Sequence, residues 1–71
     1  MSYPILRELG ELQRRVPRSD ATPAQIAAWY AGKGRLLAHI AADSGPDGGD
    51  ALEQSRVAYA HAEALTQGVA A

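Results

Sequence analysis

Apolar side chains recur through the first part of the chain at the three- and four-residue spacing of one helical face. They are Ile5, Leu6, Leu9, Leu12 and Val16, and charged side chains occupy the other faces of the same helical wheel. Pro17 ends the pattern, because the residue before a proline avoids helical backbone. The spacing therefore predicts a short amphipathic helix over residues 4–16.

The next apolar pattern covers residues 23–42 and begins with a strong helix-start signal. Thr22 can cap the N-terminus, a proline follows it, and Gln25 completes a capping box. Gly32 and Gly34 interrupt the pattern, and each glycine costs about 1 kcal/mol in a helix interior. The apolar phase is the same before and after the two glycines, so we predict one continuous helix.

Residues 43–50 read DSGPDGGD, a combination of glycine, proline and aspartate that favours turns, and we expect a flexible loop there. Asp50 can cap a following helix with Glu53 as the reciprocal partner, which predicts a third helix over residues 51–67. No segment has the two-residue alternation of a strand. The prediction is a single all-helical domain, residues 1–71, built as a three-helix bundle: a short first helix packed on an antiparallel hairpin of two longer helices.

Length and composition limit this domain further. With 71 residues the chain can form one small core, stabilised by only ~3 to 5 kcal/mol, and self-association would relieve that marginal stability. Cysteine is absent, which excludes disulfides and thiolate metal ligands. No apolar stretch approaches the roughly 20 residues that span a bilayer, and no secretory signal is evident. We therefore expect a cytoplasmic protein that does not bind membranes.

Charge is divided unevenly along the chain, although the net charge is only −1. Residues 1–40 hold six basic and three acidic side chains, a sum of +3, and residues 41–71 hold one basic and five acidic ones, a sum of −4. The two halves can attract each other within the domain, or one can form a binding face. Arg14, Arg15 and Arg18 cluster at the end of the first predicted helix, where they complement the helix dipole or contact an acidic or phosphate-bearing partner.

The sequence contains no arrangement of side chains that is typical of catalysis or of a metal site. No hydroxyl group falls in a nucleophile signature, and His39 and His61 lie near opposite ends of the predicted hairpin. Gly32, Lys33 and Gly34 lie inside a helix, whereas a phosphate-binding loop follows a strand. We therefore expect a protein that is not an enzyme and that has no cofactor.

Three aromatic side chains are candidates for binding a partner. Trp29 and Tyr30 are adjacent, so they diverge by about 100° on a helix and cannot both enter one small core. Tyr59, on the third helix, can likewise lie either in the core or at its rim. Aromatic side chains at the rim of a bundle are favoured anchors for protein partners. The alternative is that these rings cover a thin core.

One pattern in the second helix consists of Ala28, Trp29, Tyr30, Lys33, Leu36, Leu37, Ile40, Ala41, Ala42 and Asp43. It resembles short uncharacterised helical proteins of high-GC actinobacteria, which look like accessory proteins of plasmids or prophages. The resemblance covers about a quarter of the chain and implies no catalytic or ligand-binding residues.

The sequence therefore predicts a small non-catalytic protein-interaction module, an adaptor or regulator that binds another protein or a second copy of itself. The alternative is a small DNA-binding regulator that uses the basic first half. In that interpretation Gly32 breaks the second helix into a helix-turn-helix. Lys33, Arg35 and His39 then face the major groove, and the three clustered arginines contact phosphates. Few polar side chains that read bases lie in the segment that would enter the groove.

Overall fold

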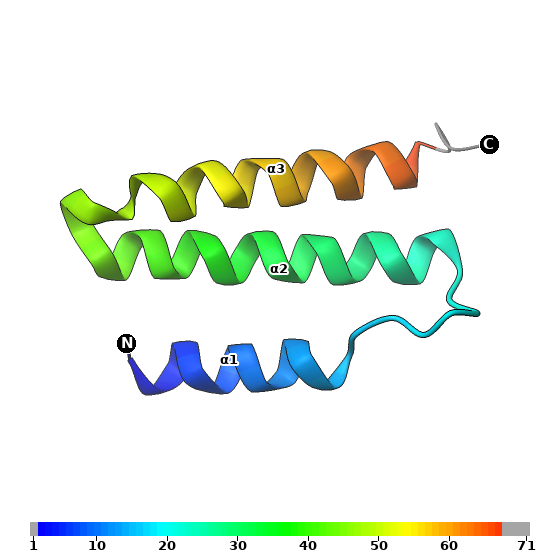
Figure 1. The fold of residues 1–71 in the computed structure, drawn as a ribbon, viewed down its shortest axis with the longest axis horizontal. Helices are drawn as coiled ribbons and strands as arrows, with labels where there is room; N and C mark the ends of the chain where they lie inside the picture. Colours follow the sequence, from blue (N-terminus) through cyan, green and yellow to red (C-terminus); the bar gives the residue numbers. More distant parts are fainter. Residues whose placement is uncertain (1, 68–71) are drawn as a thin grey trace.

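A computed structural model describes residues 2–67 of the chain (Figure 1). Within this range lie three α-helices, α1 (Tyr3–Arg14), α2 (Pro23–Ser44) and α3 (Gly49–Thr66), and a short 3-10 helix, η1 (Gly45–Gly48), joins α2 to α3. No strand occurs among these residues. The prediction of an all-helical chain is confirmed.

The sequence predicts the first helix over residues 4–16. In the structure α1 begins one residue earlier, at Tyr3, and ends two residues earlier, at Arg14. It closes where the N–H of Arg15 donates to the carbonyl of Leu12 at 3.1 Å. Ile5 is buried, while Leu6 on the same predicted stripe is 51% exposed. The apolar stripe of α1 is therefore wider than the surface that packs on α2.

α2 begins at the predicted capping box. The hydroxyl of Thr22 accepts a hydrogen bond from the N–H of Gln25 at 3.1 Å, and the N–H of Thr22 donates to Oε1 of Gln25 at 2.9 Å. The helix then continues through both glycines to Ser44, which confirms the prediction of one continuous helix. A helix-turn-helix with a break at Gly32 is not formed.

Each of the two glycines of α2 lies where a neighbouring helix packs closely against α2. A Cβ atom on Gly34 would lie 2.9 Å from the ring of Tyr59 on α3, and one on Gly32 would lie 3.3 Å from the side chain of Leu12 on α1. The hydroxyl of Ser55, which is buried, donates to the Gly34 carbonyl at 2.7 Å. Two residues correspond to about 200° of helical rotation, so α1 and α3 contact opposite sides of α2.

The predicted flexible loop over residues 43–50 is wrong, because these residues are helical throughout. Gly45 reverses the chain with φ of +62°, a value that suits glycine. Gly48 is buried against the backbone of Ala41, where no Cβ atom would fit. This packing makes Gly48 the N-cap of α3, so Asp50 lies in the first turn and does not form the predicted cap. The turn is tight because its glycines pack on α2 instead of extending into solvent.

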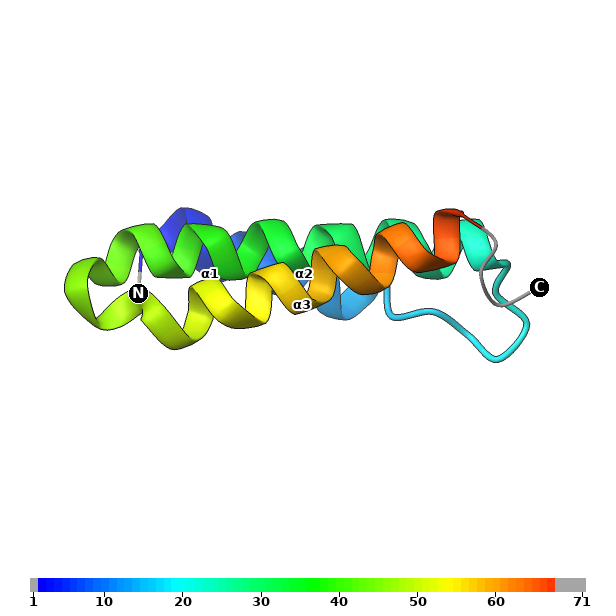
Figure 2. The same ribbon diagram turned by 90° about the horizontal axis from the view of Figure 1, so that it is seen from above.

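The helices lie side by side in one layer, with α2 in the middle (Figures 1 and 2). In the described part of the chain α1 and α3 each contact α2, but they do not contact each other. The molecule measures 39 × 22 × 12 Å, so its shortest dimension is about the diameter of one α-helix. The arrangement does not confirm the predicted three-helix bundle, in which all three helices would surround a shared core.

The buried core is thin because the α2–α3 contact is made largely of small side chains. The buried hydrophobic residues are Ile5, Ala27, Leu36, Ala58 and Ala62, and no described side chain is completely buried. Small residues allow close approach of two helices, but they bury little apolar area per residue. The described chain therefore gains only part of its stability from large core side chains.

We expect Gly34→Ala to lower the free energy of unfolding by about 1 kcal/mol. The added methyl group displaces the Tyr59 ring and weakens the contact with Ser55, an overpacking cost of about 1–3 kcal/mol that exceeds the gain of about 1 kcal/mol in helix propensity. Urea denaturation followed by circular dichroism measures the change. Gly10→Ala is the matched control, because its nearest neighbour is the end of the Arg14 side chain at 3.8 Å, and it should stabilise the chain. Equal stabilisation by both substitutions would contradict the prediction.

Candidate interaction face

Two opposite sides of α2 remain at the surfaces of the layer, because α1 and α3 cover the other two. At about 100° per residue, the positions in α2 divide between these two surfaces. We call one surface the Tyr30 face; it consists of Leu6 and Leu9 of α1, Ile26, Tyr30, Lys33, Leu37 and Ile40 of α2, and Val57 and His61 of α3. The opposite surface, the Tyr59 face, consists of Ala24, Ala28, Ala31 and Arg35 of α2 and Leu52 and Tyr59 of α3.

An aromatic cluster lies at the centre of the Tyr30 face. The ring of Tyr30 stacks on the imidazole of His61, with 4.1 Å between centroids and 13° between planes. Trp29 meets Tyr30 edge to face at 5.3 Å. The ammonium group of Lys33 lies 5.9 Å from the Trp29 centroid and 6.0 Å from the Tyr30 centroid, within the range of a cation–π interaction. This cluster combines the half-buried rings of Trp29 and Tyr30 with the exposed imidazole of His61 and one cation.

Trp29, a predicted partner-binding residue, also has a structural contact. Its Nε1–H donates to the carbonyl of Leu12 at 2.9 Å, so it joins α2 to the last turn of α1. It lines a groove of about 340 Å³ between the two helices, next to Gly32 and Arg35. Trp29 therefore connects the aromatic cluster to the α1–α2 junction.

Tyr59, the third predicted anchor, is on the opposite surface. Its ring packs against Gly34 and remains 43% exposed. It lines a shallow groove of about 740 Å³ with alanines of α2, among them Ala24 and Ala28. The structure therefore brings Trp29 and Tyr30 together but separates Tyr59 from them. Sequence spacing alone could not show this, because the choice of side depends on how α3 is rotated against α2.

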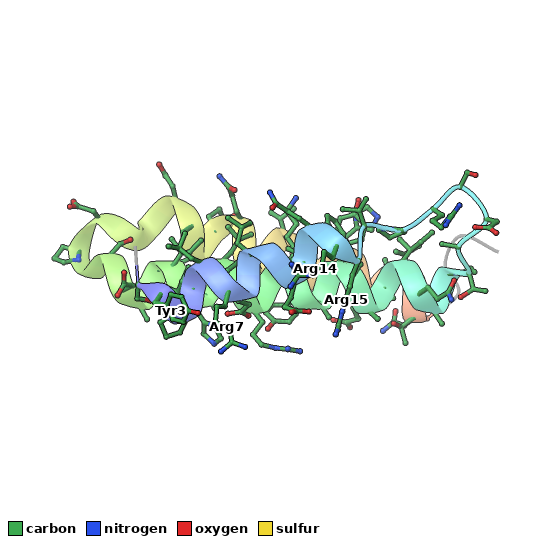
Figure 3. The ribbon with its side chains drawn as sticks, turned by 90° about the horizontal axis from the view of Figure 1, so that it is seen from below. Tyr3, Arg7, Arg14 and Arg15 are labelled. Carbon is green, nitrogen blue, oxygen red and sulfur yellow. The ribbon has the colours of Figure 1, made fainter. Side chains whose placement is uncertain are left out.

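The predicted basic residues do not form one patch. Arg14 and Arg15 lie at the end of α1 (Figure 3). Glu11 lies 2.5 Å from Arg14 and 3.7 Å from Arg15, so one carboxylate is paired with both cations. The hydrogen bond and the positive charge of Arg14 lower the pKa of Glu11 below its ordinary value of 4.5, and Arg15 lowers it further. Arg18 lies in the connector and lines a recess together with Asp20 and Arg15.

The remaining two basic candidates are on different surfaces. Arg35 lines the α1–α2 groove together with Glu8 and Arg15, whereas Lys33 belongs to the Tyr30 face. The groove contains Glu8 and Glu11 as well as the two arginines, so its charges largely cancel. An extended phosphate-binding stripe would need these cations on one surface without carboxylates between them.

Sequence reasoning missed the contact between an imidazole and a carboxyl group that joins α1 to α2. Nδ1 of His39 lies 2.6 Å from Oε1 of Glu8, although the residues are 31 positions apart. No periodic pattern marks such a pair. It also missed Val57, a β-branched apolar residue of α3 that is 60% exposed on the Tyr30 face.

The described residues contain no group of three or more histidine, cysteine, aspartate or glutamate side chains that could hold a metal ion. None of the described helices combines the length and the apolar character needed to cross a membrane. Comparison of the chain with protein-family models, with curated proteins and with solved structures finds no match. The geometry of the chain itself is therefore the basis for its functional interpretation.

We expect Trp29→Phe to lower the free energy of unfolding by about 1 kcal/mol or more. The substitution removes the donor to the Leu12 carbonyl, and a typical hydrogen bond contributes about 1 kcal/mol. Chemical denaturation followed by circular dichroism measures the change. Tyr30→Phe is the control, because the Tyr30 hydroxyl has no hydrogen-bond partner among the described residues. The prediction is wrong if the two variants are equally stable.

We expect Glu11→Gln to lower the melting temperature near pH 7 and to have no effect in strong acid. The pKa of Glu11 is lower in the folded chain than in the unfolded chain. Its contribution to stability is therefore present above pH 4.5 and is lost as the pH falls through the pKa of the folded chain. Melting curves at low salt, near neutral pH and below about pH 3, test this. Glu53→Gln is the control, because Glu53 lies 3.8 Å from Arg56 and should show a smaller effect. A pH-independent difference would contradict the assignment.

Proposed function

We propose that the chain is a small non-catalytic protein-interaction module, an adaptor or regulator, and that it binds a protein partner through the Tyr30 face. The observation that carries the proposal is the single layer of helices. Helices of globular domains bury their apolar sides against a second layer. Here the middle helix has half-buried Tyr30, Leu37 and Ile40 on a surface that no described element covers.

The composition of the Tyr30 face supports a protein as its partner. Leu6 and Val57, one on each outer helix, are 51% and 60% exposed, and large contiguous apolar surfaces on small proteins mark interaction sites. Tyrosine and tryptophan are enriched among the residues that dominate binding energy. Lys33 adds one cation at the centre, which specifies orientation more than affinity.

The alternative, a DNA-binding regulator, has less support. The continuous α2 lacks the turn that a helix-turn-helix requires. The arginines of α1 are paired with Glu11, and Lys33 is on another surface than Arg35. Binding to DNA would therefore rest on a few scattered cations.

A photo-crosslinking amino acid at position 57, compared with the same residue at position 28, tests the proposal in cells that make the chain. Val57 is on the Tyr30 face, and Ala28 is exposed on the Tyr59 face. We expect a protein adduct from position 57 and little from position 28, because only the first is at the proposed interface. Adducts with nucleic acid, or equal protein adducts from both positions, would contradict the proposal.

A further inference from the structure

We infer that the Tyr30 face is covered by a second copy of this chain, and that the two copies form an antiparallel dimer of two helical layers. The inference rests on the proposed function and names the partner. In this dimer α2 packs across α2 of the second copy, and the pair completes the two-layer architecture that one copy lacks. The two-fold axis runs in the plane of the interface, perpendicular to the helices.

The area of the face fits such a dimer. The 22 residues of α2 have a length of about 33 Å, and the layer is 22 Å wide. A rectangle of this size has an area of about 730 Å², close to the roughly 800 Å² per partner that stable interfaces bury. A second copy covers the whole face, whereas a single bound helix would leave most of it exposed.

The thin core gives a reason for the chain to associate with itself. No described side chain of the single copy is completely buried, and three of its five buried hydrophobic residues are alanines. In the dimer Tyr30, Leu37 and Ile40 lie between the two layers and become core residues. Folding and association then stabilise each other, as they do in many dimers of small chains.

The charges at the two ends of the layer select the antiparallel orientation. Four carboxylates, those of Asp43, Asp47, Asp50 and Glu53, lie around the turn that joins α2 to α3. The opposite end holds Arg14, Arg15 and Arg18 with Glu11, Asp20 and Glu63, so its charges balance. A parallel dimer would bring eight carboxylates together at one end. The antiparallel dimer places each acidic end over the end that contains the arginines.

Of the four carboxylates around the turn, only that of Glu53 has a cation within ion-pair distance, Arg56 at 3.8 Å. The arginine–carboxylate pairs among the described residues join positions three or four apart, and the contact of Glu8 with His39 joins α1 to α2. No ion pair links α3 to another described helix. The excess negative charge around the turn therefore remains exposed, and the antiparallel orientation keeps the two acidic ends of the dimer apart.

Lys33 is the residue that the dimer must accommodate, because it lies at the middle of α2, near the two-fold axis. Its ammonium group leans toward Trp29 and Tyr30, one turn nearer the N-terminus of α2. In an antiparallel pair the two ammonium groups therefore move apart, to a separation of about two turns or roughly 11 Å. At this separation the two ammonium groups make no direct contact, and each keeps its cation–π contacts with Trp29 and Tyr30 of its own copy.

Sedimentation equilibrium on the wild-type chain, with two matched variants of α3, tests the inference. Val57 is 60% exposed on the Tyr30 face, and Leu52 is 44% exposed on the Tyr59 face, so glutamate at either position is compatible with the folded chain. We expect a dimer for the wild type, at least a tenfold higher dissociation constant for Val57→Glu, and an unchanged dimer for Leu52→Glu. Circular dichroism confirms that both variants are helical.

A cysteine substitution tests the orientation, because the chain contains no cysteine of its own. Val57 lies at the middle of α3, so the antiparallel axis brings the two copies of residue 57 together. We expect Val57→Cys to give a disulfide-linked dimer under mild oxidation and Leu52→Cys to give none. A linked Leu52→Cys dimer, or an unlinked Val57→Cys dimer, would overturn the antiparallel arrangement.

A wild-type chain that is monomeric at about 100 μM would overturn the inference, since a stable interface of this area binds more tightly. A dimer that is insensitive to Val57→Glu would also overturn it. The proposed function is judged separately by the crosslinking experiment. A monomer that forms an adduct with a different protein from position 57 keeps the proposed function and rejects the second copy, whereas a monomer without any protein adduct rejects both.

Discussion

The close approach of α3 to α2 at Gly34 is the contact on which the other features of the structure depend. A side chain at position 34 would meet the Tyr59 ring, and the approach allows Ser55 to donate a buried hydrogen bond to the Gly34 carbonyl. The same closeness explains why Ala27 and Ala58 are buried while larger residues are not. At the end of the hairpin, Gly48 allows an equally close contact with the backbone of Ala41. Small residues thus fix the spacing of the hairpin along its length.

This spacing determines what the remaining side chains of α2 can do. Because the α2–α3 contact is made by alanine, glycine and serine, the large apolar residues of α2 are rotated away from it. Leu36 is buried toward α1, and Tyr30, Leu37 and Ile40 are left on a surface of the layer. Trp29 then joins the two regions, since its indole bonds to α1 while its ring contacts Tyr30. The interaction face is therefore a consequence of how closely the hairpin packs.

The sequence predicted the helices well and their packing poorly, for reasons that particular residues make clear. Apolar periodicity and the Thr22 capping box located α1 and α2, because both signals are local. Gly32 and Gly34 counted against a continuous α2, since propensity records only their cost within a helix. Their benefit, contact with Leu12 and Tyr59, is a property of the tertiary structure. For the same reason the glycines near residue 48 predicted a loop, and Tyr59 could not be assigned to a surface.

The packing also determines whether the oppositely charged halves of the sequence can contact each other. Attraction between the two halves within one molecule would require cations of α1 or α2 beside carboxylates of α3, and no such ion pair occurs among the described residues. The layer explains why, because α1 and α3 are on opposite sides of α2 and do not touch. The helices that carry most of the opposite charges are thus kept apart by the helix between them. Stacking two such layers in the antiparallel orientation would bury the Tyr30 face and keep the two acidic ends apart.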